Sequence, residues 1–172
     1  MVDPTKLKRC GKNLRAYEFT KIIMPEAVSI GDDCILDDFV FLQGGKRLEI
    51  GDQVHIASFV SITGGGEVIV GECAAIASGV KILCGTDRYV DDDGNPSAMT
   101  ASALKGRSPR RGKVVLDRHC FIGANSVVLP DVTIGEGAVV GAMSLVRRDV
   151  EPWSINVGIP CRKIGDRPKY NG

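Results

Sequence analysis

The sequence has few aromatic side chains, few histidines and almost no net charge, and each shortage excludes a class of function. Lys and Arg total 22 against 21 for Asp and Glu, so no overall charge attracts nucleic acid or an anionic membrane surface. Only two histidines occur and no cysteines form a CxxC pair, so zinc-site spacings are absent. The start MVDPTKLKRC is too polar for a secretory signal, and no apolar run approaches the roughly 18 residues of a membrane span. We therefore expect a cytoplasmic protein with reduced cysteines, no bound metal and no membrane insertion.

Glycine and aliphatic side chains are abundant where aromatic ones are scarce. Of 172 residues, 21 are Gly and 44% are hydrophobic, whereas only 5% are aromatic. This length fits one domain, which we place at 1–172. A core rich in Val, Ile and Gly but poor in large rings favours thin, regular layers.

A six-residue period runs through most of the chain. Aliphatic residues recur at every sixth position, at Ile30, Leu36 and Leu42, then Ile50, Ile56 and Ile62, then Val70, Ile76 and Ile82, and after a gap at Leu116, Ile122, Val128, Ile134, Val140 and Val146. Two residues before the next aliphatic lies a second position, filled by small or β-branched side chains such as Cys34, Val54, Ala74 and Cys120. A helix is excluded because the apolar residues lack its three-to-four-residue spacing.

This period predicts a parallel β-helix. Residues two apart on a strand share a face, so the small residue and the next aliphatic both point inward, and the remaining residues turn a corner. Three strands and three corners close one coil, and successive coils stack about 4.8 Å apart. We predict a lead-in at 1–28, a long loop at 83–113 between the third and fourth coils, and an exit segment at 152–172.

The loop at 83–113 is divided in charge. Asp87 and the acidic run 91–93 come first, and Lys105, Arg107, Arg110, Arg111 and Lys113 follow. Loops of this length without secondary structure are often functional, although a simple linker is the alternative. Such a loop is long enough to reach an adjoining subunit.

The repeat resembles that of the hexapeptide-repeat acyltransferases, whose fold is a left-handed parallel β-helix. Residues 114–165 are similar to the galactoside and maltose acetyltransferase branch and its polysaccharide acetyltransferase relatives. The matching motifs are IGANSVVLPDVTIG at 122–135, VGAMSLV at 140–146 and Gly158-Ile159-Pro160-Cys161-Arg162.

This resemblance implies an all-β enzyme that binds acetyl-CoA in a groove between subunits of a homotrimer. In such enzymes, backbone amides of corner residues bind the pantetheine arm, and the matching positions are Ala124 and Ala142. Phe121 stands where many relatives carry an aromatic wall residue. Cations suited to the phosphates of coenzyme A follow in the sequence, namely Arg147, Arg148, Arg162 and Lys163.

The catalytic base departs from the family pattern. Relatives place a histidine in the long loop, whereas this sequence reads Asp87-Arg88-Tyr89-Val90-Asp91-Asp92. Three alternatives stay open: Asp87 is the base, His55 or His119 replaces it, or the acceptor is an amine that needs less help. His55 is our first choice, because it precedes the inward Ile56 and so points outward from its strand.

We therefore expect an acetyltransferase that moves an acetyl group from acetyl-CoA to a hydroxyl or amine of a sugar or nucleotide sugar. Direct attack in a ternary complex, with no acyl-enzyme, is the expected mechanism, and cell-surface polysaccharide biosynthesis is the expected setting. The alternative is a non-catalytic β-helix that serves in assembly. A carbonic anhydrase of the same fold is excluded because it requires three histidines at its zinc and this chain has two.

Overall fold

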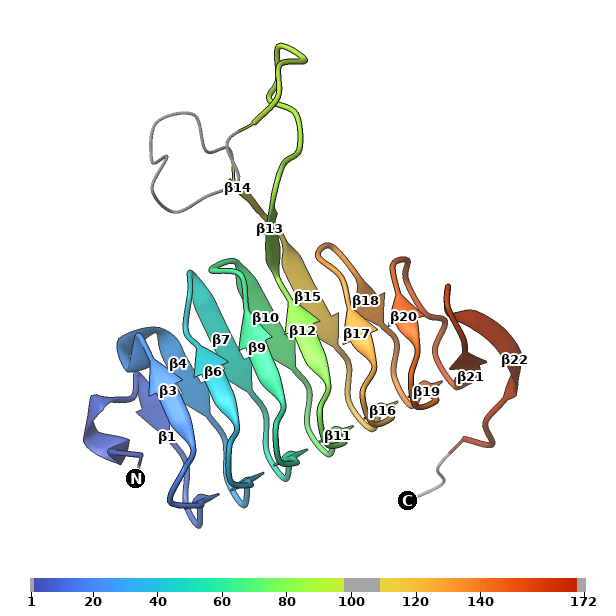
Figure 1. The fold of residues 1–172 in the computed structure, drawn as a ribbon. Coiled ribbons are helices and arrows are strands. Elements are labelled where there is room, and N and C mark those ends of the chain that lie inside the picture. Colours follow the sequence, from blue (N-terminus) through green and yellow to red (C-terminus); the bar gives the residue numbers. More distant parts are fainter. Residues whose placement is uncertain (1, 98–108, 170–172) are drawn as a thin grey trace.

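The computed structural model describes residues 2–97 and 109–169, and its coils stack into a three-sided prism that runs from the N-terminus to the C-terminus (Figure 1). Each coil contributes one short strand to each of three sheets. The first sheet contains β1 (Arg9–Cys10), β4 (Val28–Ile30), β7 (Arg47–Ile50), β10 (Glu67–Val70), β15 (Lys113–Leu116) and β18 (Thr133–Ile134). The second contains β2 (Arg15–Ala16), β5 (Ile35–Leu36), β8 (His55–Ile56), β11 (Ala75–Ile76), β16 (Phe121–Ile122), β19 (Val139–Val140), β21 (Ser154–Val157) and β22 (Arg162–Asp166). The third contains β3 (Lys21–Ile23), β6 (Phe41–Gln43), β9 (Ser61–Thr63), β12 (Lys81–Leu83), β17 (Val127–Val128) and β20 (Leu145–Val146).

Strand pairing is in register from coil to coil. Ile56 of β8 pairs with Leu36 before it and Ile76 after it, and this parallel pattern recurs through the stack. The six-residue aliphatic series and the small residues between its members are buried in one continuous core. The fold class predicted from the sequence, an all-β parallel β-helix, is therefore confirmed.

The solenoid begins earlier than the sequence pattern indicates. Residues 1–28 contain two short 3-10 helices, η1 (Pro4–Lys6) and η2 (Pro25–Ala27), but also β1, β2 and β3, which pair in parallel with the following coil. The predicted lead-in thus includes one further coil. Its inward side chains are small or only partly buried, which weakens the hydrophobic signal in the sequence.

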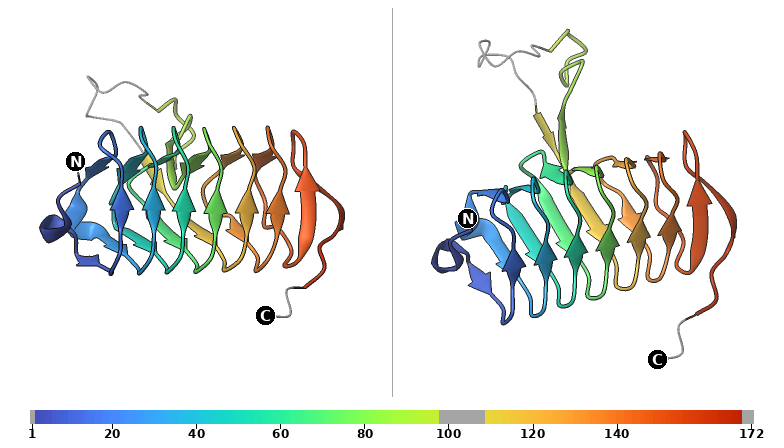
Figure 2. Two further views of the ribbon diagram at one scale, coloured as in Figure 1. Left: turned by 90° about the horizontal axis from the view of Figure 1, so that it is seen from below. Right: turned by 60° about the horizontal axis from the view of Figure 1, so that its bottom comes forward.

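The long loop leaves the prism between β12 and β15, at the predicted place. Its base is an antiparallel hairpin of β13 (Gly85–Asp87) and β14 (Pro109–Arg111), which projects away from the coils (Figures 1 and 2). The cations Lys105 and Arg107 lie outside the described residues.

The C-terminal strand β22 turns back and pairs antiparallel with β21, so it covers the last edge of the second sheet. Within residues 2–97 and 109–169 no helix has the length and apolar character needed to cross a bilayer. Over the same residues, no three His, Cys, Asp or Glu side chains gather closely enough to hold a metal ion.

Candidate functional site

The corners that join the second sheet to the third form one edge of the prism, which we call the second edge. It consists of residues 17–20, 37–40, 57–60, 77–80, 123–126 and 141–144. In the described part of the chain, the amides of Ala124 and Ala142 have no hydrogen-bond acceptor. The equivalent corner positions nearer the N-terminus carry Glu18, Asp38, Ser58 and Ser78, so only the last two corners combine open amides with a methyl side chain. A thin ligand can therefore lie against the main chain there.

Close stacking holds these two corners together. Met143 N donates to Ala124 O at 2.8 Å. A Cβ atom on Gly123 would lie only 2.4 Å from the backbone nitrogen of Ala142, so glycine is required for the coils to approach. The spacing between the two open amides is thus fixed by the repeat itself.

Phe121 lies on the outer face of β16, at the start of the same corner. Its side chain is 40% exposed, and its neighbours in the sheet are Ala75 and Val139. It precedes Ala124 by three residues, at the position for which the family resemblance implies an aromatic wall.

The four predicted phosphate-binding cations differ in their surroundings. Arg147 and Arg148 are exposed at the corner after β20 and have no ion-pair partner among the described residues. Arg162 begins β22, in the segment that runs beside β20 through the bond from Cys161 N to Leu145 O. Lys163 contacts both Glu151, at 3.0 Å, and Asp166, at 2.8 Å, and these carboxylates raise its pKa. Lys163 is already neutralised and is the weakest of the four candidates.

His55 lies on the outer face of the second sheet, where its neighbours in the adjacent strands are the apolar Ile35 and Ala75. Its Nε2 lies 3.2 Å from Oδ2 of Asp37, which begins the second-edge corner of the preceding coil. Because an ionised carboxylate only accepts hydrogen bonds, this contact places a proton on Nε2 and leaves Nδ1 as the basic nitrogen. The arrangement suits a general base with an orienting carboxylate.

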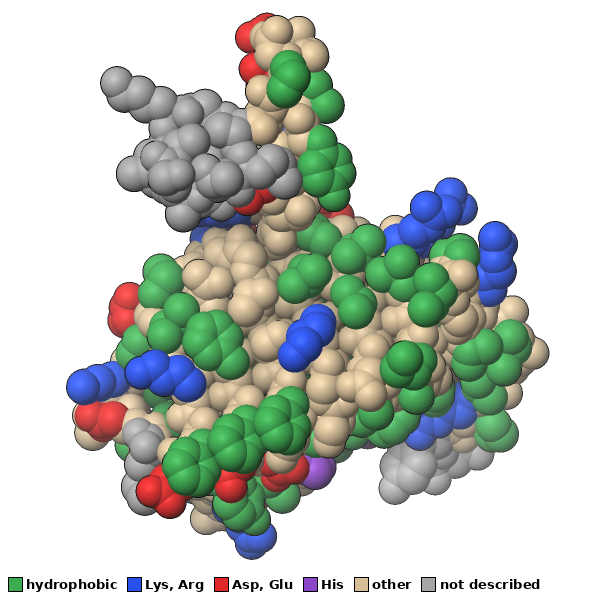
Figure 3. All heavy atoms as spheres, in the orientation of Figure 1, with side chains coloured by type: hydrophobic (Ala, Val, Ile, Leu, Met, Phe, Trp, Pro, Cys, Tyr) green, Lys and Arg blue, Asp and Glu red, His purple; other side chains and the backbone are tan. Residues whose placement is uncertain are grey.

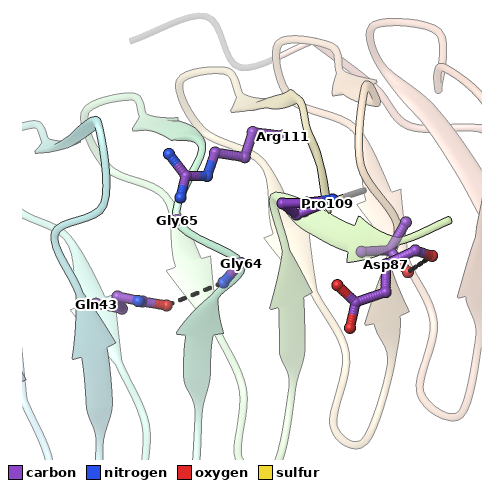
Figure 4. Close-up of a pocket in the computed structure, with 8 residues that line it drawn as sticks. Gln43, Gly64, Gly65, Asp87, Pro109 and Arg111 are labelled. Carbon is purple, nitrogen blue, oxygen red and sulfur yellow. Dashed lines mark hydrogen bonds between the residues drawn. The ribbon is translucent and has the colours of Figure 1, made fainter. Parts of the chain in front are cut away.

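Asp87 lies in a different place, in a pocket of about 560 Å³ at the base of the loop hairpin. Figure 4 shows Gln43, Gly64, Gly65 and Arg111 around the same space. Gly64 N donates to Gln43 Oε1 at 3.1 Å and so joins two neighbouring coils. The pocket is polar and carries both a carboxylate and a guanidinium group.

The predicted residues therefore fall into three groups within one chain. Phe121, Ala124 and Ala142 share the second edge, and His55 approaches that edge through Asp37. Asp87 sits on the edge that carries the loop, so one chain does not bring it to His55. His119 lies at a corner with φ of 58° on the edge between the first and second sheets, where Arg167 donates to its carbonyl oxygen.

Sequence reasoning missed Asp37 and a row of three exposed phenylalanines, Phe19, Phe39 and Phe59. Their rings stack on one another, with centroids 5.3 Å and 5.0 Å apart and planes within 5° of parallel. We call this row the phenylalanine ladder. Its residue spacing equals one enlarged coil, a signal that the sequence contains.

The buried cysteines do not fit a covalent mechanism. Burial raises the pKa of the Cys34 and Cys84 thiols, and it raises that of Cys120 to about 12. A protonated thiol is a poor nucleophile, so these side chains act as small core residues.

The sequence of the C-terminal coils matches a known family model. Residues 113–148 match the family described as bacterial transferase hexapeptide (six repeats). Over 162 residues, the chain is 36% identical to the dTDP-4-amino-4,6-dideoxy-D-glucose acyltransferase of Escherichia coli, covering 94% of this chain and 83% of that protein.

Solved structures of related proteins agree with this match. The N-acyltransferase AntD from Bacillus cereus, as a variant in complex with dTDP-4-amino-4,6-dideoxyglucose and coenzyme A, has a TM-score of 0.86 at 36% identity, over 96% of this chain and 87% of AntD. AntD in complex with dTDP and 3-hydroxybutyryl-CoA has a TM-score of 0.85 at 35% identity, over 95% and 86%. The resemblance noted in the repeat is thus confirmed, and the chain belongs to the hexapeptide-repeat acyltransferases, enzymes that use an acyl-CoA as co-substrate.

Proposed function

We propose that this enzyme transfers an acyl group from acyl-CoA to the amine of a nucleotide-linked amino sugar, such as dTDP-4-amino-4,6-dideoxyglucose. The observation that carries the proposal is the 36% identity to an acyltransferase of that sugar over 94% of the chain. An amine acceptor also accounts for the loop without histidine, because an amine needs less help from a base than a hydroxyl does. We keep acetyl-CoA as the expected donor. Because AntD binds 3-hydroxybutyryl-CoA, acyl-CoA donors with longer acyl groups should be assayed beside it.

The second edge supplies the donor site. We place the pantetheine arm along the open amides of Ala124 and Ala142, with Phe121 as its wall. The carbonyl groups of the pantetheine arm accept hydrogen bonds from these two amides. The thin arm passes over the methyl side chains of Ala124 and Ala142. Arg147, Arg148 and Arg162 then meet the pyrophosphate and 3′-phosphate, with Lys163 as a weaker contributor because two carboxylates already hold it.

His55 is the proposed base. The amine nitrogen attacks the thioester carbonyl carbon, so a C–N bond forms and the C–S bond breaks. One proton passes from nitrogen to His55 Nδ1 and then to the departing sulfur, which leaves as the coenzyme A thiol. Asp37 holds the imidazole and stabilises its positive charge. An open amide of the second edge is suited to stabilising the oxyanion.

A homotrimer completes the proposed site. The outer face of the second sheet presents Ile35, Ala75, Phe121, Val139 and Ile155 as an apolar stripe, which favours packing against another copy. The projecting loop of one subunit then lies close to the second edge of its neighbour, where Asp87 serves as an acceptor contact or as the alternative base. Six free cysteines support a reducing, cytoplasmic setting.

The test is loss of thioester absorbance with acetyl-CoA and two acceptors, dTDP-4-amino-4,6-dideoxyglucose and dTDP-glucose. We expect turnover with the amino sugar alone, because dTDP-glucose offers only hydroxyl groups. His55→Gln should lower kcat about 100-fold, whereas Asp87→Asn should mainly raise KM for the acceptor. Equal turnover of both acceptors, or of neither, contradicts the proposal. Full activity of His55→Gln with loss in Asp87→Asn moves the base to the loop.

A further inference from the structure

The phenylalanine ladder occupies the part of the second edge that the donor does not use. Its exposed rings form a row bordered by acidic side chains (Figure 3). Phe19, Phe39 and Phe59 are 57%, 52% and 58% exposed, and among the described residues no further ring stacks on the outer faces of Phe19 and Phe59. The two ends of the ladder therefore each keep an open aromatic face.

The end at Phe59 differs from the end at Phe19 in what lies beyond it. The same corner position of the next coil is Gly79, which has no side chain to continue the stack. One coil further on, the carboxamide of Asn125 turns back over Gly79, so that its Oδ1 lies 2.1 Å from where a Cβ would be. Stacked coils are about 4.8 Å apart, so two spacings separate the backbones at Phe59 and Asn125. A planar ring continuing the ladder meets a hydrogen-bonding amide there.

The charge along the edge also changes at this point. Glu18 and Asp38 border the first two rings, but the equivalent positions at the next two coils are Ser58 and Ser78. Beside Phe59, Lys81 Nζ donates to the Phe59 carbonyl oxygen at 3.0 Å and remains exposed. Within residues 2–97 and 109–169 no carboxylate forms an ion pair with Lys81, and an aromatic face beside such a cation suits a nucleotide.

The backbone at Phe59 has the conformation that most corners of the coils share. Phe59 has φ of 64°, and Phe39 and Met143 at the equivalent corners have φ of 63° and 58°. Asn125 has φ of 58° at the same position, where asparagine is well tolerated. The left-handed turn therefore belongs to the corner itself, and asparagine can stand in the place of phenylalanine there.

We infer that the pyrimidine base of the acceptor nucleotide stacks on the open face of Phe59, over Gly79, and that Lys81 binds its diphosphate. This assignment rests on the proposed function for the identity of the acceptor. It places the nucleotide on the same edge as the donor and beside the coil that carries His55.

Calorimetric titration of the full-length protein with dTDP and with pyrophosphate tests the inference. Phe59→Asn places the side chain found at the equivalent corner of another coil, so the fold should be kept, as checked by circular dichroism. We expect it to weaken dTDP binding about 10-fold or more and to leave pyrophosphate binding unchanged, because only dTDP has a base to stack. Lys81→Met should weaken both ligands.

The matched control is Phe19→Asn, at the other end of the ladder, which should bind dTDP as the wild type does. Equal loss in both phenylalanine variants, or a smaller particle by light scattering for Phe59→Asn alone, would make the ladder a subunit contact and overturn the inference. No binding of dTDP by the wild type would do the same. Normal acyl transfer with an unchanged acceptor KM in Phe59→Asn overturns the inference but leaves the proposed function in place. Absence of turnover in a wild type that binds dTDP through Phe59 contradicts the function alone.

Discussion

Raising the pH above 9 should destabilise the fold through the Cys120 thiol. This side chain fills a small inward position of the coil that carries Phe121, and burial raises its pKa from 9.0 to about 12. The unfolded chain therefore loses this proton near pH 9, whereas the native chain keeps it until about pH 12. The contribution of Cys120 to the free energy of unfolding is constant below pH 9. Between pH 9 and pH 12 the free energy of unfolding then falls by about 1.4 kcal/mol per pH unit, a total loss of about 4 kcal/mol.

Urea unfolding followed by circular dichroism at pH 8, 9, 10 and 10.5 measures this slope. Cys120→Ala is the matched variant, because Ala74 and Ala138 occupy the same inward position in other coils. Lysine and tyrosine titrations affect both proteins alike, so the difference between them isolates the thiol. Wild type and variant losing stability in parallel above pH 9 would show that Cys120 ionises as easily in the folded chain, and would refute the reasoning.

Three further changes test the site. Gly123→Ala should weaken binding of coenzyme A and lower the melting temperature, because the added Cβ meets backbone 2.4 Å away, whereas Gly165→Ala has nothing within 4 Å and should change neither. Asp37→Asn should lower kcat about 10- to 100-fold with the KM for acetyl-CoA unchanged, and adding it to His55→Gln should cost little more; additive losses would mean that the two side chains act separately. Arg147→Ala should raise the KM for acetyl-CoA several-fold but not that for acetyl-pantetheine, which lacks the nucleotide phosphates; an equal rise for both would remove Arg147 from the phosphate site.

The core was predictable because inward positions follow a strict rule. In a stack of short strands, every sixth residue points inward and packs against the equivalent residues of the coils above and below it. Burying a polar side chain there is costly, so these positions are occupied by Ile, Leu and Val. The sequence pattern did not predict the first coil. Cys10, Ala16 and Ile22 keep the six-residue period there, but two of these side chains are small and all three are only partly buried at the end of the stack. End coils bury less surface, so the sequence constrains them less.

The site was only partly predictable, because its contacts join residues a whole coil apart. The family motif predicts a role in donor binding for Ala124 and Ala142, and that proposed role depends on backbone geometry that the repeat imposes. The same motif gave no sign that Glu151 and Asp166 neutralise Lys163, because ion pairs follow side-chain placement and not spacing. Likewise, the 18 residues between Asp37 and His55 become a contact only after the coil length is known.

The corners are where one repeat can vary without losing its fold. Every coil needs its inward ladder, so the strands are constrained nearly alike, but a corner needs only a backbone that turns. Phe59, Gly79 and Asn125 all meet that need with a left-handed backbone, although their side chains differ completely. The second edge therefore changes character along its length, from phenylalanine and acidic side chains at the first coils to Ser78, Ala124 and Ala142 at the later ones, where Met143 is the large exposed side chain. Since the coils are rigidly stacked, the proposed donor and acceptor sites keep a fixed order along one edge, and such an end-to-end arrangement is what direct transfer between two ligands requires.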